Sequence, residues 1–249
     1  MNKLKISAIF AAILLVSIAF VPAVSAKADI SQNEKYGDAI DISNEKSISE
    51  EDIKKALENT NKISESMNVL SETDNEKIVS FKKDDGSIGY AILWKDEKNS
   101  NRTYFAVVDL DELVAEKFVS ATSLNDSAAV AAAISAAKSS FANGSYVETY
   151  GDNITGGLHI YFSPKDADLL ADGSSAIAGA LAAVLGLYVS GGMLSIALGT
   201  LVGLAVQTWY WYEQNSDGSL DVRIPYVNIA TIPLTGHVYM KIGSHWYTI

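Results

Sequence analysis

An uncharged run from Gly173 to Tyr212 constrains this chain more than any other feature. A single membrane span needs about 20 apolar residues, and this run is long enough for two. Small residues at 190–192 interrupt it near its middle and favour a turn there. The run therefore predicts two apolar helices folded back on each other, a helical hairpin within residues 164–212.

Small residues recur at every fourth position in both arms of this predicted hairpin. Because residues four apart lie on one face of a helix, each arm carries a narrow seam of small side chains. Such seams let two backbones approach closely, so we expect the arms to pack through them and the leucines outside them to face away. The same faces would allow self-association of the chain. The predicted seam consists of Ala178, Ala182, Gly186 and Ser190 in the first arm and Gly191, Ser195, Gly199 and Gly203 in the second.

The second arm has the dimensions of a membrane span. From Met193 onward it rises about 30 Å at 1.5 Å per residue, close to one hydrocarbon thickness. It ends in Trp209, Tyr210, Trp211 and Tyr212, a cluster typical of membrane interfaces. Few polar residues mark a solvent-facing side. We therefore expect the hairpin to be inserted in a lipid bilayer.

Two other arrangements of the same run stay open. A hairpin buried in the core of a soluble protein would also be rich in alanine and glycine. The first arm favours this alternative, because Asp172 would lie within a span ending at Tyr188 and would cost about 3 kcal/mol. A single long span would put the C-terminal strands in the cytoplasm, but acidic residues flank both ends and give no positive-inside asymmetry.

The N-terminus has the order of a secretory signal peptide. Lys3 and Lys5 precede an apolar stretch over 6–21, and small residues at 24–26 suit a signal peptidase. We expect residues 1–26 to be removed and the mature chain to begin at Lys27. The protein is then exported, either to the extracytoplasmic side of a membrane or into the medium.

Composition excludes several classes of function. The chain has no cysteine, so disulfides, thiolate nucleophiles and cysteine-ligated metals are excluded. Its formal charge is −11; loss of the two signal lysines leaves 17 basic against 30 acidic residues, or −13. An acidic protein repels phosphate backbones, so nucleic acid is not an expected partner. Affinity for a bilayer would have to come from apolar burial.

Periodicity outlines an α+β fold with an N-terminal antiparallel-sheet domain. Ser49 is a predicted helix N-cap, and Asp85-Gly86 is a predicted hairpin turn. Residues 114–120 fit either a strand or a short helix. Helices are predicted at 50–68 and 127–141 and from Ser163-Pro164, and strands at 77–82, 88–94, 103–108, 146–150, 158–162, 220–224, 238–242 and 246–249.

The predicted domain organisation follows from these elements. A flexible acidic leader at 27–47 precedes an extracellular α+β domain at 48–163. The apolar hairpin occupies 164–212, and a short β-rich tail occupies 213–249. We expect the sheet of the N-terminal domain to fold without the hairpin.

No residue pattern points to catalysis, a cofactor or a metal. His159, His237 and His245 belong to no metal-binding motif, and we interpret them as structural strand residues. Asp109-x-Asp111 and Asp166-x-Asp168 lack an EF-hand loop, so we interpret these aspartates as caps or solvated charge. Glycosylation sequons begin at Asn101, Asn125, Asn143 and Asn153, and they matter only in a host that glycosylates.

Three functions fit the sequence. The favoured one is a non-catalytic cell-envelope protein held at the membrane by its hairpin. The second is the precursor of a secreted membrane-active peptide carried in residues 164–249; the layout resembles that of helical-hairpin bacteriocins and pore-formers in architecture, without a shared motif. That segment holds three basic and six acidic residues, whereas membrane-attacking peptides use cationic faces. The third is a soluble secreted binding module with the hairpin buried.

Overall fold

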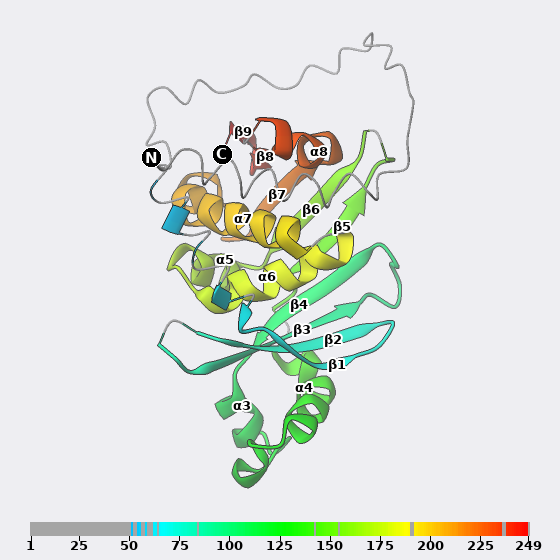
Figure 1. Ribbon diagram of the computed structural model, residues 1–249, viewed down its shortest axis with the longest axis vertical. Helices are drawn as coiled ribbons and strands as arrows, with labels where there is room; N and C mark the ends of the chain where they lie inside the picture. Colours follow the sequence, from blue (N-terminus) through cyan, green and yellow to red (C-terminus); the bar gives the residue numbers. More distant parts are fainter. Residues whose placement is uncertain are drawn as a thin grey trace.

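The fold is built on one antiparallel sheet in which strand order follows chain order from β1 to β9 (Figure 1). The computed structural model describes residues 51–248 except 52, 53, 56, 57, 59–61, 64, 84, 142, 154, 190, 191, 236 and 237. The predicted signal peptide and leader therefore lie outside the described residues. The strands are β1 Asn68–Glu72, β2 Glu76–Lys82, β3 Ile88–Lys95, β4 Arg102–Val108, β5 Tyr146–Tyr150, β6 Gly157–Phe162, β7 Leu220–Pro225, β8 Tyr239–Ile242 and β9 His245–Thr248.

Helices are inserted between strands at three places. Two follow β4 and three follow β6, while the last links β7 to β8. They are α3 Leu110–Ala115, α4 Ser127–Phe141, α5 Pro164–Ala171, α6 Ser175–Tyr188, α7 Gly192–Glu213 and α8 Tyr226–Thr235. The α+β class predicted from the sequence is consistent with this arrangement of helices and an antiparallel sheet.

The two faces of the sheet are covered by different helices. Successive strand residues point to opposite faces, so Val79 and Leu93 pack with α6 and α7 while Ile78 and Ile92 pack with α3 and α4. The larger core lies under α5, α6 and α7 and extends from β2 to β9. The smaller core lies under α3 and α4 and is confined to β1–β4. On this second side, the part formed by β4–β9 is here named the open face.

The hairpin arms form the centre of the larger core. Figure 1 shows α6 and α7 side by side across the sheet. The leucines outside the seams do not face away from the protein: Leu181, Leu185 and Leu198 are 0% exposed. The expectation that they face outward is wrong, because the sheet supplies the apolar surface that these side chains need. Residues Leu194–Glu213 of α7 have the length and composition of a span, and 61% of that stretch is buried in the protein.

The C-terminal strands continue the same sheet. β7 pairs with β6 over six residue pairs, from Gly157↔Pro225 to Phe162↔Leu220. β8 and β9 then extend the sheet, and Val222, Met240 and Tyr247 belong to the larger core. The strands β7, β8 and β9 of the predicted tail thus belong to the same sheet as the strands that precede the hairpin.

Three elements differ from the prediction. The helix predicted at 50–68 ends earlier, because Leu70 belongs to β1 and pairs within the sheet instead of extending an apolar helix stripe. Residues 114–120 form neither a strand nor a helix of their own: 114 and 115 end α3, which begins at Leu110 because Asp109 caps it, and 116–120 are turn and irregular chain. No residue pattern predicted α8 (Tyr226–Thr235), which is rich in β-branched residues and contains Pro233, features that do not favour helix by propensity.

Candidate functional site

The predicted seam residues meet across α6 and α7 in three pairs. A Cβ atom on Gly199 would lie 2.9 Å from Ala182 Cα and 3.0 Å from Ala182 Cβ. A Cβ atom on Gly186 would lie 3.4 Å from Ser195 Oγ, and one on Gly203 would lie 4.0 Å from Ala178 Cβ. The closest approach is therefore at Gly199. Ser190 and Gly191 lie outside the described residues.

The aromatic cluster that ends α7 is divided between core and surface. Trp209 and Tyr210 are 3% and 4% exposed, and Trp209 packs on Tyr247 of β9 with ring centroids 4.7 Å apart. Tyr210 donates a hydrogen bond to Gly218 O at 3.1 Å. Trp211 and Tyr212 are 60% and 81% exposed. Only the last two could meet a membrane interface or a partner.

A row of aromatic rings, one from each of four neighbouring strands, begins on β3 at the edge of the smaller core and continues onto the open face. Trp94, Tyr104, Tyr146 and Tyr161 are directly opposite one another in the register, and all are partly exposed. Their ring centroids are 5.5, 6.1 and 5.1 Å apart in that order. Cross-strand aromatic pairs stabilise a sheet, so this row has a structural role of its own. We name these four residues the aromatic row.

A second row, two residues further along the strands, consists of charged side chains. The charged row is Arg102, Glu148, His159, Arg223 and Lys241, each opposite the next on β4 to β8. Arg102 donates to Glu148 Oε2 through Nε at 2.9 Å and forms an ion pair through Nη2 at 2.8 Å. Its guanidinium also lies 4.0 Å from the Tyr146 ring centroid. The first half of the row is thus a closed network of ion pairs.

His159 links this network to β7. Its Nδ1 lies 3.1 Å from Glu148 Oε1 and its Nε2 lies 2.6 Å from Asp221 Oδ1, and its side chain is only 12% exposed. The hydrogen bond with Asp221 is the main cause that raises the pKa of His159, against the opposing effect of burial, and Glu148 adds to it. The same bond lowers the pKa of Asp221. Both shifts favour an imidazolium held between two carboxylates.

The other half of the charged row places cations side by side. Arg223 is directly opposite both His159 on β6 and Lys241 on β8. Like charges directly opposite each other destabilise a sheet. Within the part of the chain that the structure describes, no carboxylate lies within 4.0 Å of the Arg223 or Lys241 nitrogens. These two side chains therefore form the positively charged end of the row.

A buried carboxylate lies in the first turn of α5. Asp166 is 2% exposed and accepts hydrogen bonds from Asn143 Nδ2 at 3.0 Å, from Ser163 Oγ at 3.0 Å and from Ser145 Oγ. Ser163 Oγ in turn accepts from the Asp166 backbone N–H, which caps α5, and the Ser163 backbone N–H donates to Ser145 Oγ at 2.9 Å. Asp166 also lines a cavity of about 880 Å³ that reaches α3. Its donors explain the burial of this group without a ligand.

A second buried carboxylate ends α7. Glu213 is 9% exposed and accepts hydrogen bonds from the Tyr247 hydroxyl and from His245 Nδ1. The distance from His245 Nδ1 to Glu213 Oε1 is 2.7 Å. A carboxylate at a helix C-terminus meets the negative end of the dipole, so it needs such donors. This contact ties β9 to the hairpin.

The other aspartates and histidines that the sequence analysis named are placed as follows by the described residues. Asp109 caps α3 and Asp168 is exposed, while His237 lies outside the described residues. No group of three or more His, Cys, Asp or Glu residues in the described ranges could hold a metal ion. Among the sequons, Asn101, Asn125 and Asn153 are exposed, whereas the Asn143 amide is bound to Asp166 and partly buried.

Sequence reasoning missed the charged row altogether. Its members lie at alternate positions of strands whose inward-facing residues are mostly apolar, such as Val147 before Glu148 and Ile160 after His159. That alternation marks a face of the sheet, but it does not reveal which strands are neighbours. Compared with protein-family models, with curated proteins and with solved structures, the chain matches none.

Proposed function

We propose that this protein is an exported, soluble binding protein in which the apolar hairpin serves as core and the open face meets the ligand. The observation that carries the proposal is the packing of α6 and α7 on the sheet. Leu181, Val184 and Leu185 of α6 and Leu198, Val202 and Val206 of α7 are all 0% exposed. Insertion in a bilayer would remove these side chains from the sheet and leave its apolar face without cover.

The open face supports binding as the role. Its rings and charged groups are exposed or partly exposed, and the pairing of β4 to β8 fixes them in register. A ligand surface held on strands is more rigid than one carried on loops, which favours recognition by preformed groups. We assign no reaction to the site, because Glu148 and His159 of the charged row and the neighbouring Asp221 bond to one another.

Fractionation of the source cells tests this proposal. We expect the processed chain to be soluble without detergent, outside the cytoplasm, and to stay soluble after an alkaline carbonate wash. Recovery only in the washed membrane pellet would overturn the proposal. It would favour the membrane-held envelope protein, because only an inserted hairpin resists such a wash.

One observation favours that second candidate. Trp211 and Tyr212, together with Leu187 at 48% exposure, leave large apolar side chains at the surface of the hairpin. Sedimentation with neutral vesicles tests whether they bind lipid. Binding that is lost in Trp211→Ser/Tyr212→Ser, with the fold intact, would indicate peripheral attachment through the end of α7.

Release of residues 164–249 as a peptide is less compatible with the packing. Cleavage before α5 would leave β7 paired with β6 over six residue pairs, and the two pieces would have to separate through the larger core. A fragment of this size in the medium, found by mass measurement, would nonetheless favour the precursor function.

A further inference from the structure

Among the described residues, no carboxylate forms an ion pair with the positively charged end of the charged row. Arg223 and Lys241 are neighbours across β7 and β8, and His159 stands on the other side of Arg223. Asp221 lies on the same face of β7, but its carboxylate already accepts from His159 and from Asn215 Nδ2 at 3.1 Å. A row of cations that destabilises the free sheet would be stabilised by an anion bound across it.

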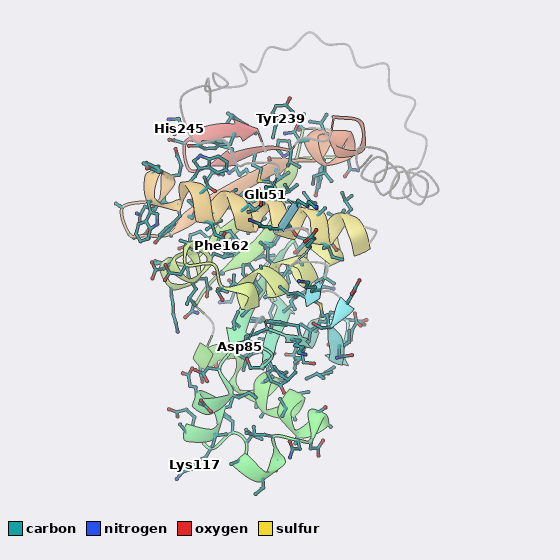
Figure 2. The ribbon with its side chains drawn as sticks, turned by 60° about the vertical axis from the view of Figure 1, so that its left-hand side comes forward. Glu51, Asp85, Lys117, Phe162, Tyr239 and His245 are labelled. Atoms are coloured by element: carbon teal, nitrogen blue, oxygen red, sulfur yellow. The ribbon has the colours of Figure 1, made fainter. Side chains whose placement is uncertain are left out.

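Aromatic rings lie beside these cations. The Tyr150 ring centroid is 6.0 Å from Arg223 Cζ, and Trp246 on β9 is directly opposite Lys241. Both rings are partly exposed. Tyr239 on β8, which is labelled in Figure 2, is 43% exposed. Rings of this kind offer apolar contact next to a charged contact, which suits a ligand with both characters.

The geometry points to an acidic polysaccharide as the ligand: we propose that its carboxylates bind Arg223 and Lys241 and that its sugar rings lie against Tyr150 and Trp246. This inference rests on the proposed function as an exported binding protein. The cations are spaced by the distance between neighbouring strands, about 4.8 Å, so a linear polymer lying across the strands meets them in succession.

Two other polyanions fit less well. An acidic peptide would be expected to add to a sheet edge through its backbone, whereas these residues lie on a face. A nucleic acid carries one charge per about 1.7 Å of duplex and needs many cations, while this row offers few within a chain of formal charge −11. The negative net charge of the protein also repels an acidic polysaccharide. Salt screens this repulsion between charges more than about 8 Å apart, but it leaves the direct contacts with Arg223 and Lys241 in place.

The test uses the purified protein and three probes at physiological salt: de-esterified oligogalacturonate, its methyl ester and poly-L-glutamate. Calorimetric titration should give binding only with de-esterified oligogalacturonate. In Arg223→Gln/Lys241→Gln we expect binding at least about tenfold weaker, since charge-assisted contacts are lost. Lys82→Gln/Lys117→Gln removes the same charge at distant positions and should change affinity less than about twofold; Figure 2 shows Lys117 at the opposite end of the molecule from Tyr239.

Stability measurements separate loss of the site from loss of the fold. Removing facing cations should leave the thermal midpoint of the unliganded Arg223→Gln/Lys241→Gln protein unchanged or higher. If that protein fails to fold, Lys241→Gln alone carries the same test. Equal weakening in the control pair, equal binding of poly-L-glutamate, or no binding of oligogalacturonate would each overturn the inference. None of these outcomes bears on whether the protein is exported and soluble, which fractionation decides.

Discussion

Gly199 of α7 lies directly on the backbone of Ala182 of α6, so closely that a single added methyl group would come within 2.9 Å of the Ala182 Cα atom. The contact fixes how near the two arms of the hairpin lie. It also determines how far the side chains on the other sides of α6 and α7 reach into the sheet. Close approach of this kind needs a residue without a side chain at the crossing.

The first prediction compares two glycines of the same helix. Gly199→Ala should lower the free energy of unfolding by about 1–3 kcal/mol, because the methyl group overpacks the crossing. Gly203→Ala should be neutral or stabilising by up to about 1 kcal/mol, because its methyl group meets only Ala178 Cβ at 4.0 Å and alanine favours helix. Urea unfolding measures both. Equal effects would mean that α6 and α7 do not cross at Gly199.

The second prediction concerns pH and His159. Its pKa is raised above the ordinary value of 6.5, so its ion pairs stabilise the fold fully below that pH and are lost as pH rises through the folded-state pKa. Asp221 has a lowered pKa, so its contribution is present above 3.8 and is lost as pH falls through the folded-state value. The ion pair between His159 and Asp221 should therefore contribute most to stability between pH 3.8 and pH 6.5.

Unfolding in urea from about pH 5 to about pH 9 checks this dependence against His159→Gln. The stability difference between the two proteins should shrink as pH rises through the upper part of the range. A difference that is constant with pH would contradict the assignment of a charged imidazolium.

The third prediction tests the contact that ties β9 to the hairpin. Tyr247→Phe should cost about 1–3 kcal/mol, because it removes a hydroxyl donor from the buried Glu213 carboxylate. Tyr212→Phe makes the same chemical change at a side chain that is 81% exposed, and it should leave the denaturation midpoint unchanged. Similar losses in both variants would show that the Glu213 carboxylate does not depend on Tyr247.

The fourth prediction reverses an expectation from the sequence about residues 48–163. This fragment would lack α6, α7 and β7, which bury Phe105, Leu158 and Ile160 of the sheet. We therefore expect the fragment to show no cooperative thermal transition. We also expect it to bind an apolar dye, because the apolar face of its sheet would be exposed to water. A sharp transition in calorimetry would mean that the N-terminal strands and α4 suffice for a fold.

Local pattern determined much of the secondary structure. Alternation over Ile88–Lys95, alanine content over Ser127–Phe141 and the Ser163-Pro164 pair each indicated the element that is found, because these signals depend on neighbouring residues only. A period of four is a property of one helix, so the sequence could also predict a seam of small residues on each arm of the hairpin. The local pattern did not predict β1, because this strand is formed by pairing with β2.

Only the tertiary structure decided what surrounds the hairpin. An uncharged helix is equally suited to lipid and to an apolar sheet, so the sequence of α7 could not distinguish them, whereas the sheet covers Leu198 and Val206 completely. The charged row was hidden for a related reason. Arg102, Glu148 and Arg223 are far apart in the chain, and strand register alone brings them onto one line of the open face.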